Sequence, residues 1–194
     1  MNFLAHIYLS GDDEGVIIGN FIADGIKGKK YNSYPPAIKK GILLHRAIDS
    51  YTDKHPMVKQ STSRLHKNYG HYSGVIVDIL YDHFLAKNWN KYHPNPLFVF
   101  VENFYDILRK NYEILPLGIQ RMMPIMMSQN WLLSYASTEG IARILSQMNI
   151  RTKGRSKMNL AILELETYYE EFEAEFEAFF AELIAYSKNK LHQL

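Results

Sequence analysis

Apolar residues that recur with the 3.6-residue period of a helix, divided into segments by proline and glycine, are the feature that most constrains this fold. The period-two alternation typical of half-buried strands is scarce. Pro35 and Pro56 stand where helices can begin, and Gly28 and Gly70 stand where helices can end. The pattern predicts helices over 15–27, 35–53, 56–68, 72–92, 97–113, from 116 onwards, 139–149 and 158–190.

These segments predict an all-α protein of about seven or eight helices, folded as a single domain over residues 1–194. A chain of 194 residues, 47% of them hydrophobic, is long enough for one sizeable core. The first residues lack a basic region, and His6 interrupts their apolar run, so they do not resemble a signal peptide. No apolar run approaches the roughly 18 residues of a membrane span. We therefore expect a soluble, cytoplasmic protein with no membrane partner.

Charge is distributed unevenly along the chain. The net charge is +2, but residues 158–194 hold eight glutamates and two lysines, so the preceding residues carry an excess of +8. Two short segments concentrate this excess, one from 27 to 46 and one from 151 to 157. The pattern is compatible with an ordinary solvated surface or with a basic face that attracts an acidic macromolecule. No nucleic-acid-binding motif is present, so we expect no nucleic-acid partner.

Three pairs of polar side chains share a four-residue spacing inside apolar helices. Residues i and i+4 lie on one helix face, one turn apart. A single pair is most often a satisfied hydrogen bond, Asp24 alone could cap a glycine turn, and Asp82 alone could pair with Arg46. Three pairs within 63 residues are explained more simply by one shared site. The pairs are Asn20 and Asp24, His45 and Asp49, and Asp78 and Asp82.

Such a site would be suited to a hard divalent cation. The chain has no cysteine, which excludes thiolate sites and disulfides. Carboxylates with one or two imidazoles favour Mn²⁺, Mg²⁺ or Fe²⁺. These ions lower the pKa of a bound water and polarise phosphoryl oxygens, so hydrolysis of a phosphate ester is the natural chemistry. Neither a P-loop nor a serine nucleophile elbow is present.

Five sequence blocks resemble the acyl carrier protein phosphodiesterase family. The blocks are MNFLAH (1–6), GNFIADGIKG (19–28), GILLHRAIDSYTDKHP (41–56), DILYDHFLAKNW (78–89) and QNWLLSY (129–135). The resemblance implies a helical, cytoplasmic, bacterial hydrolase that depends on a divalent metal, preferably manganese. Its substrate would be holo-acyl carrier protein of fatty acid biosynthesis, from which it would release 4′-phosphopantetheine and leave the apo-carrier.

The family is also thought to be distantly similar to HD-type metal phosphohydrolases, which implies an HD-phosphohydrolase-like fold. This chain has no His-Asp dipeptide; it has His45-Arg46 and the reversed Asp82-His83. The ligand set of HD enzymes therefore cannot be transferred directly. Acyl carrier proteins are strongly acidic, which matches the basic excess of residues 1–157.

The residues and the resemblance together give one set of site predictions. The metal ligands are expected among Asp24, His45 and Asp82, followed by Asp49 and Asp78. His6 or His83 could protonate the leaving serine oxygen, and Arg46 could hold a non-bridging phosphate oxygen. Asn20 could orient Asp24 or complete the coordination shell.

Two alternatives remain open at this stage. One is a metal-dependent phosphohydrolase of the same type that acts on a small nucleotide. The other is a non-catalytic helical interaction protein, in which the aspartates pair with Arg46, Lys39 or Lys40. The sequence does not indicate an oligomeric state.

Overall fold

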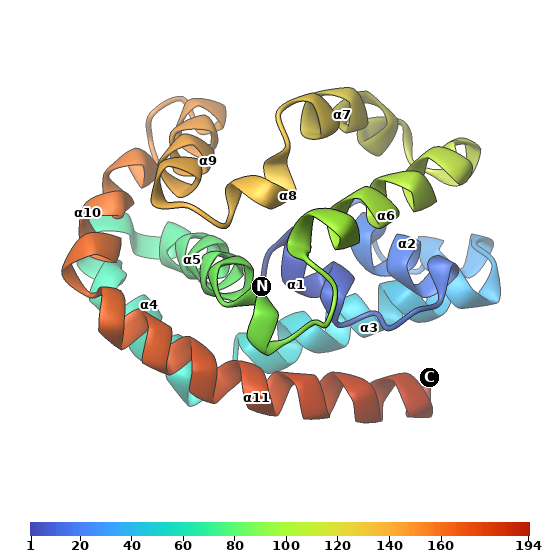
Figure 1. The fold of residues 1–194 in the computed structure, drawn as a ribbon, viewed down its shortest axis with the longest axis horizontal. Helices are drawn as coiled ribbons and strands as arrows, with labels where there is room; N and C mark the ends of the chain where they lie inside the picture. The colour runs from blue at the N-terminus through green and yellow to red at the C-terminus, as the bar shows by residue number, and fades with distance from the viewer.

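The computed structural model describes residues 1–194, which form eleven α-helices and no strand, so the all-α prediction is confirmed (Figure 1). Short 3-10 turns join several of the helices. The helices are α1 (Phe3–Tyr8), α2 (Glu14–Ile22), α3 (Pro36–Thr52), α4 (Pro56–Tyr69), α5 (Ser73–Lys87), α6 (Leu97–Lys110), α7 (Leu117–Ser128), α8 (Trp131–Ser134), α9 (Thr138–Arg151), α10 (Ala161–Thr167) and α11 (Tyr169–Gln193).

Three short helices raise the number above the predicted seven or eight. The six-residue α1 and the four-residue α8 are too short to show a clear apolar period in the sequence. The segment 158–190 does not form one helix: the turn η6 (Met158–Leu160) and α10 precede α11. Pro124 does not end α7, which continues to Ser128.

One hydrophobic core of 47 buried residues takes members from every α-helix. Helix α11 packs along α3, α4 and α5, and the predicted apolar stripe of this helix is buried: Phe172, Phe176, Phe179 and Leu183. Helices α7, α8 and α9 lie on the opposite side of α1 and α5 from α11 (Figure 1). None of the helices combines the length and the apolar composition required to cross a lipid bilayer.

The crossing of α2 and α3 is a backbone-to-backbone contact at glycines. A Cβ atom on Gly19 would lie 2.0 Å from the carbonyl oxygen of Ile38, and one on Gly41 would lie 2.2 Å from that of Val16. Only glycine allows helices to approach this closely. The close approach brings the end of α2, which carries Asn20, against the middle of α3.

Candidate metal centre

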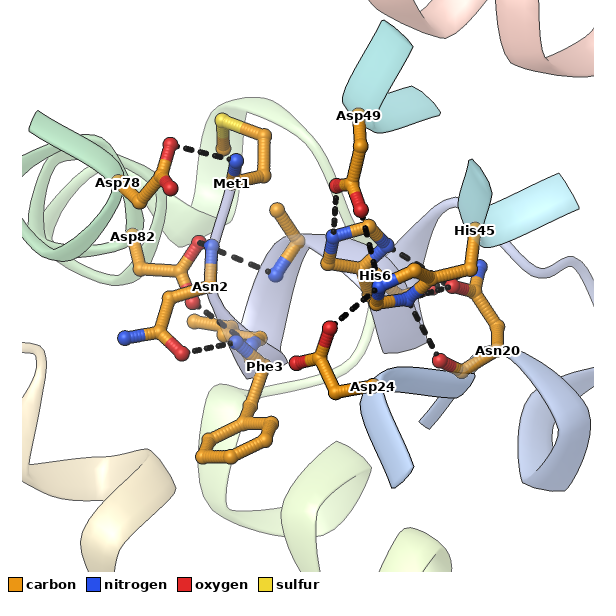
Figure 2. Close-up of polar contacts among 12 residues, drawn as sticks. Met1, Asn2, Phe3, His6, Asn20, Asp24, His45, Asp49, Asp78 and Asp82 are labelled. Carbon is orange, nitrogen blue, oxygen red and sulfur yellow. Dashed lines mark hydrogen bonds and ion pairs between the residues drawn. The ribbon is translucent and has the colours of Figure 1, made fainter. Parts of the chain in front are cut away.

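Two imidazoles and two carboxylates from three elements meet beside the α2–α3 crossing (Figure 2). His6 is on α1, and Asp24 is on the 3-10 turn η1 (Ala23–Gly25) that extends α2. His45 and Asp49 are one turn apart on α3. The rings of His6 and His45 are stacked, with centroids 3.9 Å apart. Both rings are almost fully buried, whereas the Asp24 side chain is 78% exposed.

Asn20 fixes the orientation of both rings. Its side-chain oxygen accepts from His6 Nδ1 at 2.8 Å, and its backbone oxygen accepts from His45 Nδ1 at 2.8 Å. Its amide nitrogen donates to the His6 carbonyl and to Ser10 Oγ, so the amide is fully used. Because each Nδ1 donates its hydrogen, each neutral ring presents the lone pair of Nε2 on the other side. Imidazoles that bind metals in proteins are commonly held in this way.

Both Nε2 atoms face carboxylate oxygens. His6 Nε2 lies 3.2 Å from Asp49 Oδ1, and His45 Nε2 lies 3.1 Å from both Asp49 Oδ2 and Asp24 Oδ1. His6 Nε2 is buried and has no hydrogen-bond partner. Lone pairs that face one another repel unless a proton or a cation lies between them. The donor set therefore fits a cation: ligand atoms of His6, His45 and Asp49 all lie within 4.8 Å of one another, a group that could hold a metal ion.

The pKa values of these side chains reflect the same concentration of charge. Burial lowers the pKa of His45, but hydrogen bonds with Asp24 and Asp49 overcome this effect and raise it to about 9. Burial, and then the charge of His45, lower the pKa of His6. Burial would raise the pKa of Asp49, yet its contacts with His45 and His6 hold it well below the ordinary value. The group is thus organised around ionised carboxylates and one positive charge.

The group opens onto a cavity of about 650 Å³. Asp24, His45 and Asp49 line it, together with Asp53 and Asp78. Much of the remaining lining is apolar and comes from α7, α8 and α9, through Ile119, Met122, Trp131, Ile144 and Met148. The cavity therefore joins a polar, cation-compatible region to an apolar region, as expected for a ligand with a charged end and a less polar body.

The third predicted pair, Asp78 and Asp82, is directed to the start of the chain (Figure 2). Asp82 is fully buried and accepts from the amides of Leu4 at 2.7 Å and of Asn2 and Ala5 at 3.3 Å, so it caps α1. Asp78 pairs with the Met1 amino group at 2.7 Å. Burial raises the pKa of Asp82 to about 7, although the amino group and the α1 amides act in the opposite direction. The amides at the start of α1 thus engage Asp82, and the Met1 amino group engages Asp78, so both carboxylates serve the N-terminal segment.

His83 and Arg46 also have partners away from the imidazoles. His83 Nδ1 donates to the carbonyl of Tyr135 at 2.7 Å, and His83 Nε2 lies 2.8 Å from the Tyr169 hydroxyl. Arg46 donates to the carbonyls of residues 26 and 28 and lies over the Tyr31 ring. Neither residue lines the cavity. His83 thus links α5 to the segments around α8 and α11, and Arg46 fastens the loop after η1.

His6 lies with His45 and Asp49 in the group that could hold a metal ion, whereas the sequence suggested a proton donor. Its only signal was a histidine inside an otherwise apolar run, with no acidic or imidazole partner four residues away. Asn20 was expected to act on Asp24 or on the ion, but its contacts are with the two imidazoles. Asp53, one turn after Asp49 in the sequence, also lines the cavity and was not among the predicted site residues.

Comparison with known proteins identifies the family. The family model for acyl carrier protein phosphodiesterase matches residues 1–183. Proteins named acyl carrier protein phosphodiesterase from Pectobacterium atrosepticum and Photorhabdus laumondii are 30% and 31% identical over 191 residues. These alignments span 98% of this chain and 99% and 96% of the relatives. No solved structure matches, so the likeness to HD-type phosphohydrolases stays a prediction. The chain belongs to the acyl carrier protein phosphodiesterase family.

Proposed function

We propose that this protein hydrolyses the phosphodiester between 4′-phosphopantetheine and a serine of holo-acyl carrier protein, using a divalent cation held by His6, His45 and Asp49. Asp24, which faces His45 Nε2 and is exposed to the cavity, is the fourth candidate ligand. The relatives, which are named acyl carrier protein phosphodiesterases, support the identity of the substrate. One observation supports the ion most directly: the buried Nε2 of His6 faces Asp49 and has no hydrogen-bond partner.

Imidazole and carboxylate donors without thiolates favour Mn²⁺, with Mg²⁺ and Fe²⁺ as substitutes. When bound, such an ion would lower the pKa of water and offset charge on the phosphoryl oxygens. The protein's own residues would do the positioning. Asn20 holds both imidazoles in the tautomer that directs Nε2 to the ion, and α1 carries His6 into place because Asp82 caps it.

The two regions of the cavity suggest how the prosthetic group would lie. The phosphodiester would be placed at the Asp24, His45 and Asp49 end. The pantetheine arm would extend along the apolar residues of α7 to α9, such as Met122 and Met148. Burial of the arm would orient the phosphate for attack and exclude bulk water from its surroundings.

The test uses holo-carrier with the protein, with and without Mn²⁺, and follows the mass of the carrier. We expect conversion to the apo form with Mn²⁺ and none with EDTA. The Asp49→Asn variant should lose both bound metal, measured by elemental analysis, and turnover. The matched control, His66→Asn, changes an exposed histidine of α4 and should retain both.

An unchanged carrier mass in the presence of Mn²⁺ would contradict the proposed activity. Wild-type metal content in Asp49→Asn would contradict the proposed centre. A parallel incubation with small nucleotides separates the carrier substrate from the nucleotide alternative. If a nucleotide is hydrolysed and holo-carrier is not, the protein is a nucleotide phosphohydrolase.

A further inference from the structure

The second basic segment of the chain lies at the edge of the cavity. Helix α9 lines the cavity with residues one turn apart, Ile144, Met148 and Arg151. The chain then continues into the loop 152–157, which carries Lys153, Arg155 and Lys157. All of these cations are exposed. Between Glu139 and Glu164 the chain has no acidic residue, so this surface has an uncompensated positive charge.

No acidic side chain pairs with the four cations from Arg151 to Lys157, although Arg151 also donates to the sulfur of Met148 at 3.6 Å. None of them takes part in an ion pair. In the first basic segment, Arg46 is bound to two carbonyls and Lys39 lies over the Tyr31 ring. Its other lysines also lack ion pairs, but no cation of that segment lines the cavity. Unpaired cations that adjoin a cavity are available to an external anion.

The loop is held in one shape. Ser156 is buried, and its hydroxyl bonds to Thr152 Oγ1 at 2.7 Å and to Asn149 Oδ1 at 3.1 Å. Lys153 and Lys157 have positive φ angles of 56° and 54°, a backbone conformation that lysine seldom adopts. Strained conformations that the surrounding bonds maintain tend to occur at functional surfaces. A preorganised loop also loses little conformational entropy when a partner binds.

An apolar residue accompanies the charges. Ile150 is 74% exposed, the highest value among the exposed large hydrophobic side chains of the protein. A basic rim around an exposed apolar side chain suits an acidic helical surface with an apolar residue of its own.

We propose that the surface formed by Ile150, Arg151, Lys153, Arg155 and Lys157 is where the acidic carrier protein docks. This inference rests on the proposed function for the identity of the partner. From that surface, the face of α9 with Met148 and Ile144 leads into the cavity, so a docked carrier would deliver its prosthetic group along α9 toward the proposed ion.

The test reverses charge in the loop and in the first basic segment to the same extent. The variants are Arg155→Glu/Lys157→Glu and, as the matched control, Lys29→Glu/Lys30→Glu, all at exposed positions. Arg151 is left unchanged because it lines the cavity. At low salt, KM for holo-carrier should rise about tenfold or more in the first variant with little change in kcat. The increase should shrink as salt screens the charges. The control should change KM by less than about twofold.

Two further measurements separate this inference from the proposed activity. Binding of fluorescently labelled holo-carrier, measured by anisotropy, should weaken to the same extent as KM rises, and it does not require turnover. Hydrolysis of a small chromogenic phosphodiester, if the wild type cleaves it, should be equal in all three proteins. Circular dichroism of each variant verifies the fold, and Arg155→Gln/Lys157→Gln should show a smaller weakening of the same kind.

The results have defined meanings. Equal weakening in the two charge-reversal variants, or none in the loop variant, would overturn the docking surface. The proposed docking surface would also be rejected if the wild-type protein does not bind holo-carrier at low salt. If holo-carrier binds in a way that depends on the loop but no phosphopantetheine is released, the docking surface is supported and the proposed hydrolysis is rejected.

Discussion

A single methyl group at the α2–α3 crossing should disturb the proposed metal centre without touching any of its candidate ligands. In Gly41→Ala, the new Cβ would lie 2.2 Å from the Val16 carbonyl oxygen and 2.7 Å from the Asn20 backbone nitrogen. Ordinary contacts begin near 3.4 Å, so the helices must separate by roughly 1 Å at this point. Overpacking of this size destabilises a protein by about 1–3 kcal/mol.

The functional effect should exceed the loss of stability. Asn20 orients both imidazoles, so a shift of α2 moves the atoms that hold the two rings. A displacement of about 1 Å can reduce turnover about 10²-fold. Urea denaturation would measure the free energy of unfolding, and the carrier mass assay and elemental analysis would measure turnover and bound metal.

The matched control is Gly74→Ala, on α5, where a Cβ meets nothing within 4 Å. This variant should keep wild-type turnover and gain up to about 1 kcal/mol of stability, because alanine favours a helix over glycine. If Gly41→Ala matches the wild type in stability, bound metal and turnover, the crossing does not position the site and the reasoning is refuted.

Two further predictions concern α5. Asp82→Ala should lower the free energy of unfolding by about 3 kcal/mol, since buried α1 amides lose their acceptor, and it should also weaken metal binding through His6. Asp106→Ala, which breaks only an exposed pair with Arg109, should cost less than about 1 kcal/mol; equal losses in the two variants would contradict the capping role. Burial lowers the pKa of His83, so the unfolded chain takes up its proton near pH 6.5 and the folded protein does not. Stability should therefore fall as pH drops below 6.5, with a contribution of up to about 1.4 kcal/mol per pH unit that is missing in His83→Asn; parallel stability curves for the two proteins would contradict this.

The sequence allowed the fold class to be predicted, and it had singled out as candidate ligands three of the four side chains that meet at His45: Asp24, His45 and Asp49. The pairs Asn20–Asp24 and His45–Asp49 were visible because a four-residue spacing on an apolar helix survives in any tertiary arrangement. The pair Asp78–Asp82 has the same spacing but a different environment. Its partners are the Met1 amino group and backbone amides at the start of α1, and such backbone groups leave no signal in a sequence.

The position of His6 could not be predicted for a related reason. A six-residue helix shows too little periodicity to be recognised, so the ring had no predicted direction. The break between α10 and α11 at Tyr168 could not be predicted from the sequence either. Residues 161–193 have helical periodicity on both sides of it, and only packing determines where the direction changes.

The dependence of α1 on Asp82 has a consequence for the order of events during folding. A helix of six residues is not stable alone, so His6 reaches its place only after residues some 80 positions later have packed against it. In zinc fingers, by contrast, the metal drives the folding of the peptide. Here the ion would bind only after the tertiary structure has formed, so metal uptake would indicate that the N-terminal half of the chain has folded.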